Sequence, residues 1–295
     1  MTWTHDDANA LYSVPSWGDD FFKVSAKGNV VVSPRCWDPE KRIDLYELLA
    51  AVKRRGIQTP VLFRFEGILR SRVRELSSSF KRASREYGLK SSYRPIYPIK
   101  VNQQRDVVQQ IIHHGQQFGA GVEAGSKPEL LAVVAMTDAD TPIICNGFKD
   151  AEFIRMALLA QRLGRTVIPV VEKVSELDLI LKISKELGVR PTLGMRVKLA
   201  TRGSGRWQAS GGYRSKFGLT VAEMLTQLDR LIDHGMGACF QLLHFHVGSQ
   251  VGNIRQLKAA IMEASRIYVD LHRRGAGLKY LDVGGGLGVD YDGSQ

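Results

Sequence analysis

The feature of this sequence that most constrains its fold is a regular alternation of short apolar runs with amphipathic segments. The apolar runs predict strands at 95–100, 117–122, 142–145, 166–171, 192–198, 239–246 and 279–283. The segments between them predict helices at 105–114, 127–136, 150–164, 175–187, 221–234 and 253–274. Because parallel strands need long crossover connections, which helices supply, the alternation predicts an α/β fold with a parallel sheet.

Two architectures share this alternation: an open doubly wound sheet and a closed (β/α)8 TIM-type barrel. An open sheet binds its ligand at one switch point, whereas a barrel gathers chemistry around a ring of strand ends. Here the residues that close or follow the predicted strands include Lys100, Glu123, Asn146, Glu172, Arg196, His246 and Gly284. Polar groups at so many strand ends favour the barrel.

We assign residues 1–43 to an amino-terminal extension that contributes to a β-domain, and residues 44–295 to the barrel. The extension is expected to be irregular, with a β-prone run at 28–33, followed by helices at 44–55 and 68–87 around a strand at 61–65. Counted from the strand of Lys100, the sequence stops about one strand short of a closed barrel. Because an open barrel exposes two sheet edges, we expect this chain alone to aggregate and to be inactive.

The composition of the sequence indicates where the protein is located and which kinds of partner to expect. The sequence has no apolar run of about 18 residues and no basic segment followed by an apolar one at its start, so neither a membrane span nor a signal peptide is expected. Cys36, Cys145 and Cys239 lie far apart without a CxxC pair, which predicts reduced thiols and a cytoplasmic protein. The net charge of +11 comes from scattered Lys and Arg residues, so we expect no nucleic-acid partner, with an RNA-binding module as the alternative.

Lys100 and His246 are candidate reactive groups. Lys100 ends an apolar strand, where desolvation lowers the pKa of an amine and makes it able to form a Schiff base; the alternative is a surface lysine. His246 lies in FHVGS at 245–249, where its ring is placed to stack on a flat cofactor and Ser249 to bind a phosphate. The alternative for His246 is a core histidine before an ordinary turn.

A glycine-rich turn, GGGLG at 284–288, follows the last predicted strand. Glycines let backbone amides converge on an anion, so the turn is a candidate phosphate cradle. The same spacing fits a partial dinucleotide fingerprint, and a simple tight turn is a third interpretation.

Glu123, Arg196 and a long loop complete the candidate set. Glu123 closes a strand, whereas Ser126 and Glu129 form the pattern of a capping box at a helix start. Arg196 closes another strand, where it is expected to pair with an acid or an anion. The loop at 202–212 is rich in Gly, Ser and Arg and is a candidate lid over a bound anion, or else a solvated linker.

Together these strings resemble the alanine-racemase-like, fold-type III pyridoxal-phosphate decarboxylases, over roughly 97–294. The order is specific: a strand-end lysine in YPIKVNQ, then EAGSKPE, RSKFG, FHVGS and LDVGGGLGVDY. Within that family, YPIKVNQ, ICNGFK at 144–149, the long loop ending in RSKFG and the last string are most similar to the biosynthetic arginine decarboxylases. Diaminopimelate and ornithine decarboxylases are the near alternatives.

The resemblance implies a role for each matching residue. It implies that Lys100 carries pyridoxal phosphate, that His246 stacks on its ring, and that Glu123 and Arg196 lie beside it. It implies that Ser249 and the amides of Gly284, Gly285 and Gly286 bind the phosphate. The segment that would border the substrate comprises Leu281, Asp282, Val283, Gly284, Gly285, Gly286, Leu287, Gly288, Val289, Asp290 and Tyr291, with Asp290 or Asp292 as candidate partners of a guanidinium group.

The resemblance also implies the reaction and the setting. The activity would be decarboxylation of L-arginine to agmatine and CO2, the first step of a polyamine route toward putrescine and spermidine, with magnesium as an accompanying ion. The family's acid for the pyridine nitrogen lies in an EPGR-like string, which does not follow Gly288 here. A homodimer or higher oligomer is expected of the full-length protein. Other classes left open are a non-catalytic pyridoxal-phosphate-binding homologue and a dinucleotide-dependent dehydrogenase.

Overall fold

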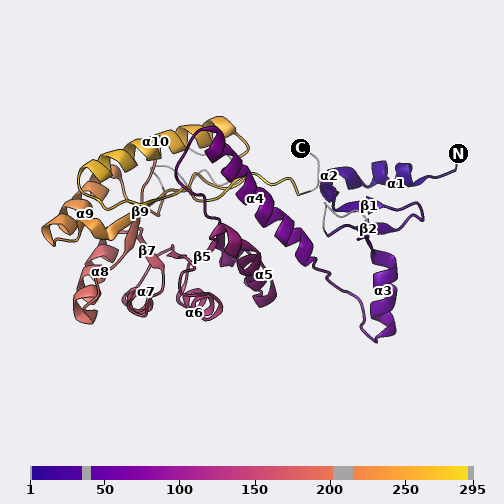
Figure 1. Ribbon diagram of the computed structural model, residues 1–295, viewed down its shortest axis with the longest axis horizontal. Helices are drawn as coiled ribbons and strands as arrows, with labels where there is room; N and C mark the ends of the chain where they lie inside the picture. Colours follow the sequence, from indigo (N-terminus) through magenta and orange to yellow (C-terminus); the bar gives the residue numbers. More distant parts are fainter. Residues whose placement is uncertain (1, 35–40, 202–214, 292–295) are drawn as a thin grey trace. The chain divides into compact units, whose positions relative to one another are not determined.

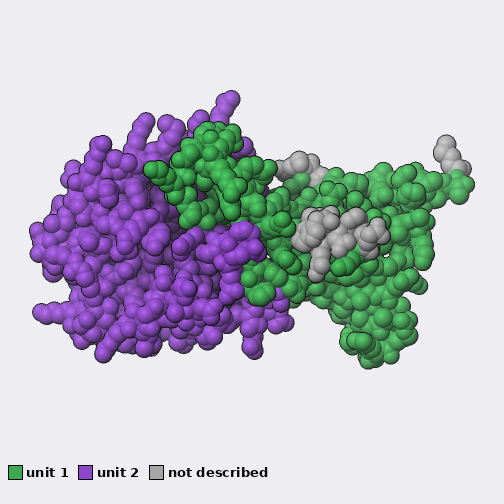
Figure 2. All heavy atoms as spheres, viewed as in Figure 1, with its two compact units in different colours: residues 1–93, 113–115, 289–295 green, residues 94–112, 116–288 purple. Residues whose placement is uncertain are grey.

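The computed structural model describes residues 2–34, 41–201 and 215–291. These residues divide into two compact units (Figures 1 and 2). One unit comprises residues 1–93, 113–115 and 289–295, and the other comprises residues 94–112 and 116–288. The domain boundary that we expect between residues 43 and 44 stays a prediction.

Within its described residues, the smaller unit contains a three-stranded antiparallel sheet and four helices. Its strands are β1 (Phe22–Val24), β2 (Val30–Val32) and β3 (Ile43–Asp44), paired in that order. Its helices are α1 (His5–Leu11), α2 (Val14–Gly18), α3 (Leu45–Arg54) and α4 (Glu66–Glu86). The β-prone run at 28–33 is confirmed as β2. The irregular structure expected before it is wrong, because α1 and α2 form there and a reciprocal capping box between Thr4 and Asp7 starts α1.

The strand expected at 61–65 does not form. Residues 61–65 have no ladder partner, and Phe65 instead precedes α4 as its N-cap. The ring of Phe65 packs edge-on against Phe22, with 6.4 Å between the ring centroids. The apolar character of this run therefore reflects packing of individual side chains, which composition alone does not separate from strand pairing.

The described part of the larger unit is built on one parallel sheet of seven strands. They are β4 (Ile96–Pro98), β5 (Gly121–Ala124), β6 (Ile143–Cys145), β7 (Val167–Val171), β8 (Leu193–Arg196), β9 (Phe240–His244) and β10 (Tyr280–Asp282). The strands pair in unbroken chain order from β4 to β10, and every pair is parallel. A doubly wound sheet has a different strand order, with a reversal point. The predicted β/α-barrel class is confirmed, with seven of its strands in the described part of the chain.

Helices connect successive strands of this sheet (Figure 1). They are α5 (Arg105–Gly115), α6 (Lys127–Met136), α7 (Ala151–Arg162), α8 (Val174–Leu187), α9 (Val221–Asp233) and α10 (Ile254–Arg273). Their bounds lie within two residues of the predicted ones. The helical period is a strong signal here because each helix buries one apolar face against the sheet, as Ile154 and Leu158 of α7 do.

The sheet is apolar on both faces. Alternate strand residues such as Val167 and Val171 face the helices, in two large buried clusters. Ile168, Val170 and Leu242 form a separate small cluster, with Ile144 among its members, which is the inner face of the curved sheet. Burial on both faces explains why the strands appear in the sequence as continuous apolar runs.

Helix starts on the carboxyl side of the strands follow the predicted chemistry in part. Ser126 and Asp150 each accept a backbone N–H, from Glu129 (3.4 Å) and Phe153 (2.8 Å). Helix α8 begins at Val174 after Lys173 as its N-cap, which makes no side-chain capping bond. The predicted capping box is also incomplete. The Glu129 carboxylate accepts the N–H of Gly125 at 2.6 Å.

We predict that Gln161→Ala lowers the free energy of unfolding by about 2 kcal/mol, since three hydrogen bonds to backbone groups are lost. Gln161 Nε2 donates to the carbonyls of Val167 (2.7 Å) and Thr192 (2.6 Å), and its Oε1 accepts the N–H of Thr192 (3.1 Å). Urea unfolding measures the change. Gln241→Ala is the control, since its side chain makes one long contact of 3.5 Å. Equal stability of the two variants would contradict the prediction.

Candidate active site at the carboxyl ends of the strands

Lys100 and Glu123 form an ion pair at the carboxyl ends of the first two barrel strands. Lys100 lies in the 3-10 turn Ile99–Val101 that follows β4, and Glu123 lies in β5. Because Pro98 is the register partner of Glu123, Lys100 reaches the carboxylate with its Nζ 2.9 Å from Oε1. The Lys100 side chain is 63% exposed and that of Glu123 only 16%. The desolvation that we expected for the amine is therefore wrong: the amine is accessible and paired.

His246 follows β9 and is partly buried. Burial, together with the smaller effects of the positive charges of Arg196, His244 and Lys100, lowers the pKa of His246 to about 4, against an opposing effect of Glu123. The ring is therefore neutral at neutral pH. The strand expected to run to residue 246 ends at His244, so His246 stands on the turn beyond it.

The glycine turn packs tightly against the segment that carries His246. Gly284 and Gly286 have φ values of +67° and +96°. A Cβ on Gly284 would lie 2.5 Å from the carbonyl oxygen of Phe245, and one on Gly286 would lie 1.8 Å from that of Gly248. These two positions therefore require glycine for two reasons, conformation and space. Gly285 has neither constraint, since no atom lies within 4 Å of its Cβ position.

Two backbone bonds link the glycine turn to the loop after His246. The N–H of Val251 donates to the carbonyl of Gly286 (2.9 Å), and the N–H of Gly288 donates to the carbonyl of Val251 (3.1 Å). The N–H of Gly284 donates to Oδ1 of Asp282 (2.9 Å). Of the three amides expected to bind an anion, that of Gly284 is therefore occupied. Those of Gly285 and Gly286 have no other bond among the described residues.

Arg196 is held at the end of β8 by a buried carboxylate. Its Nη1 lies 3.5 Å from Oε2 of Glu172, whose other oxygen accepts the N–H of Gly147 at 2.9 Å. The guanidinium also lies over the ring of Phe217, 5.4 Å from its centroid. Because Glu172 is fully buried, its pairing with Arg196 fixes the cation more firmly than an exposed salt bridge would.

His244 is a buried polar residue that the sequence patterns did not single out. It is the last residue of β9, is 4% exposed, and its Nδ1 lies 3.0 Å from Oδ2 of Asp282. The available signal was the alternation His244-Phe245-His246, which puts a second histidine at the inner side of the same strand end.

The other predicted site residues differ in burial and in the unit to which they belong. Ser249 is exposed in the turn after His246, and Leu281 and Val283 are partly buried at the end of β10. Leu287 and Gly288 lie in the same unit as these, and Val289, Asp290 and Tyr291 belong to the smaller unit. Asp292, Cys36 and residues 202–214 lie outside the described residues. Cys145 and Cys239 are buried free thiols.

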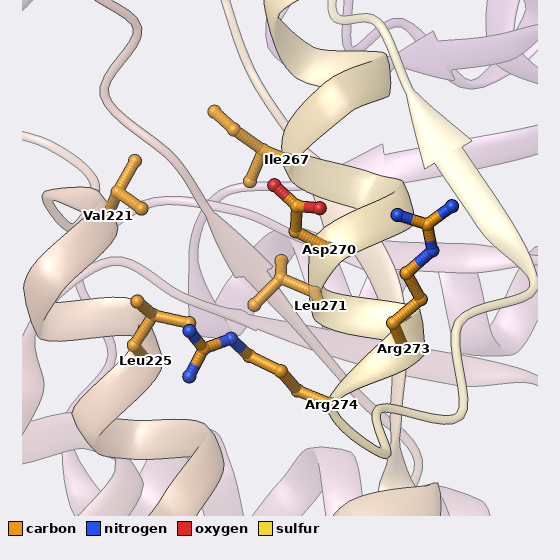
Figure 3. A pocket seen from close by; sticks show the side chains of 7 residues that line it. All are labelled: Val221, Leu225, Ile267, Asp270, Leu271, Arg273 and Arg274. Carbon is orange, nitrogen blue, oxygen red and sulfur yellow. The ribbon is translucent and has the colours of Figure 1, made fainter.

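A pocket of about 360 Å³ lies apart from these residues, between α9 and α10 (Figure 3). Side chains from the two helices line it, namely Val221, Leu225, Ile267, Asp270, Leu271, Arg273 and Arg274. It contains none of the predicted site residues.

The chain matches the family described as pyridoxal-dependent decarboxylase, pyridoxal binding domain, over residues 73–295. It belongs to this family. The dinucleotide interpretation of the glycine turn is not supported, since that fingerprint opens a helix and the described residues after Gly284 form none.

Two relatives of this chain bear the same name. The chain is 68% identical to the biosynthetic arginine decarboxylase of Rhodopirellula baltica and 50% identical to that of Bacteroides thetaiotaomicron, over 99% of the chain in both cases. The crystal structure of the biosynthetic arginine decarboxylase of Campylobacter jejuni matches with a TM-score of 0.85 and 32% identity, over 96% of this chain and 45% of that one. A diaminopimelate decarboxylase of Helicobacter pylori shares the fold, with a TM-score of 0.68 and 23% identity, over 85% of this chain and 59% of that one.

The chain spans less than half the length of these curated relatives, 44% of the first and 46% of the second. The family match covers the pyridoxal-binding region, residues 73–295.

We predict that Gly286→Ala weakens pyridoxal phosphate binding at least about tenfold, because displacing the turn removes a charge-assisted bond worth about 1.5–3 kcal/mol. The new Cβ would collide with the Gly248 carbonyl. Gly285→Ala is the matched control, since it keeps the amide and has open space around its Cβ. Fluorescence titration of both variants with the cofactor measures the effect. Equal affinity of the two variants would show that the turn does not bind the cofactor.

We predict a pH effect on stability from His246. Since its pKa falls from 6.5 to about 4 on folding, its contribution is complete above pH 6.5 and is lost as the pH falls toward 4. The free energy of unfolding should then drop by up to about 1.4 kcal/mol per pH unit in that window. Urea unfolding of the wild type and His246→Asn measures this, with His234→Asn as a control at an exposed histidine. An identical pH slope in the wild type and His246→Asn would refute the prediction.

Proposed function

We propose that this chain binds pyridoxal phosphate on Lys100, and that the full-length protein decarboxylates L-arginine to agmatine and CO2. The single observation that carries the cofactor part is the accessible Lys100 amine beside Glu123, in a chain of the pyridoxal-dependent decarboxylase family. The substrate part rests on the two biosynthetic arginine decarboxylases that are 68% and 50% identical to this chain.

The residues at the strand ends fit this cofactor. The glycines at 284 and 286 let the turn pack closely against the segment of His246, and the amides of Gly285 and Gly286 are suited to an anionic phosphate. Ser249 adds an exposed hydroxyl on the neighbouring turn. The neutral ring of His246 is suited to stack on a flat aromatic ring without placing a second positive charge against it.

In this proposal each residue at the strand ends has a separate role. Lys100 provides the amine that attaches the cofactor, and Glu123 orients that amine and balances its charge. Arg196, fixed by Glu172, places a permanent positive charge near His246. Bound pyridoxal phosphate would supply the electron sink that accepts the electron pair left when a carboxylate departs as CO2.

Several further features belong to the proposal. Agmatine would enter a polyamine route toward putrescine and spermidine. A homodimer or higher oligomer and a cytoplasmic location are proposed from the family resemblance and the scattered cysteines. Magnesium is proposed as an accompanying ion. Among the described residues no three His, Cys, Asp or Glu side chains gather to hold a metal, so no residue is assigned to it. In the same part of the chain, every helix is too short or too polar to cross a bilayer.

The attachment site can be tested by labelling. Reduction of the full-length protein with borohydride in the presence of pyridoxal phosphate should fix the cofactor to Lys100, and peptide mass spectrometry should find it there. Lys100→Ala should lose this label and at least about 1000-fold in activity, because the covalent step loses its amine. Lys127→Ala, which removes another ion-paired lysine, is the control and should keep the label. A label on a different lysine would overturn the assignment.

The substrate can be tested on the same protein. Carbon dioxide release from arginine, ornithine, lysine and diaminopimelate should be detected with arginine alone, together with agmatine. Release from ornithine or diaminopimelate instead would keep the cofactor assignment and replace the substrate.

A further inference from the structure

His244 and Asp282 are paired at the ends of adjacent strands. They are register partners on β9 and β10, and Nδ1 of His244 lies 3.0 Å from Oδ2 of Asp282. The His244 side chain is 5% exposed and that of Asp282 is 21% exposed. Nδ1 makes no hydrogen bond among the described residues, so the contact is a close approach of the ring nitrogen to the carboxylate.

Asp282 connects this pair to the glycine turn. Its Oδ1 accepts the N–H of Gly284 at 2.9 Å, while its main-chain carbonyl accepts the N–H of Phe245 at 3.1 Å. Burial by itself raises the pKa of Asp282, but the nearby charge of His244 and the hydrogen bond from the Gly284 N–H outweigh it, so the pKa is lowered overall. The side chain of Asp282 is therefore a charged carboxylate. In this form it accepts the N–H of Gly284 more strongly than a neutral carboxyl group would.

The orientation of the turn depends on this link. On its far side the turn is fixed by the two backbone bonds to Val251. On its near side Asp282 provides the side-chain contact, at Gly284. Rotation of the Asp282 carboxylate would release Gly284 and turn the two following peptide groups, whose amides face the proposed phosphate.

We propose that His244 is a positioning residue for the cofactor phosphate: it holds the Asp282 carboxylate in the orientation that fixes Gly284 and aims the amides of Gly285 and Gly286. This inference rests on the proposed function, since it assumes that the turn binds the phosphate of pyridoxal phosphate. His244 itself touches neither the phosphate nor the substrate in this assignment.

The test compares two ligands that differ only in the phosphate. Dissociation constants for pyridoxal phosphate and for pyridoxal are measured by fluorescence titration on the full-length protein. His244→Phe keeps a ring of similar size and removes the nitrogen, and it should weaken pyridoxal phosphate about tenfold while leaving pyridoxal within about twofold. His244→Asn places an amide nitrogen near the position of Nδ1 and should restore most of the lost affinity.

A matched control separates positioning from general destabilisation. Leu231 is fully buried in α9, away from the strand ends, and Leu231→Ala should lower the unfolding temperature without changing the ratio of the two dissociation constants. If His244→Phe weakens both ligands equally, or neither, His244 has a packing role and the proposal is wrong.

A second variant and the wild type complete the experiment. Should His244→Phe fail to fold, Asp282→Asn tests the same link, because it keeps the side-chain shape and removes the charge that attracts His244; an unchanged ratio would then overturn the proposal. If the wild type itself does not bind pyridoxal phosphate, the proposed function and this inference both fall. If it binds and the variants keep the wild-type ratio, only the inference about His244 falls.

Discussion

The whole site depends on the parallel pairing of the barrel strands in chain order. Parallel pairing brings all carboxyl ends to one edge of the sheet, and consecutive order makes neighbours of residues that are far apart in sequence. The register then decides which side chains meet: Glu123 lies opposite Pro98, and His244 lies between Arg196 and Asp282. A register shift of one residue in any of these strand pairs would turn its side chains to the other face of the sheet and separate the polar side chains of the site.

The charges at this edge are balanced within pairs. Each cation has an acid beside it, Lys100 with Glu123 and Arg196 with Glu172, while His246 stays neutral because charging it would oppose both burial and nearby cations. Free backbone amides on the glycine turn add positive potential without a titratable group. Paired ions and backbone amides therefore lie together at this edge of the sheet.

Much of this arrangement was predictable from the sequence. Helices that bury one face and strands buried on both faces leave strong patterns, so the order, type and approximate bounds of the barrel elements were correct. The run at 61–65 and the first helices were not, because isolated aromatic contacts and a single capping box decide them locally. The His244–Asp282 contact depends on strand register, which a periodicity does not give. The hydrogen bond from the Gly284 N–H to Asp282 depends on atomic geometry, which a glycine-rich pattern does not predict.

The two turns after β9 and β10 have a consequence for how such a chain tolerates change in length. Val251 bonds to both Gly286 and Gly288, so the two turns form one small piece of sheet-like structure with a fixed count of residues on each side. An insertion in either turn would move His246 relative to the glycines. An added residue in an exposed helix-to-strand connection would only lengthen a loop on the surface. Natural variation in length should therefore be concentrated in those connections and avoid these two turns.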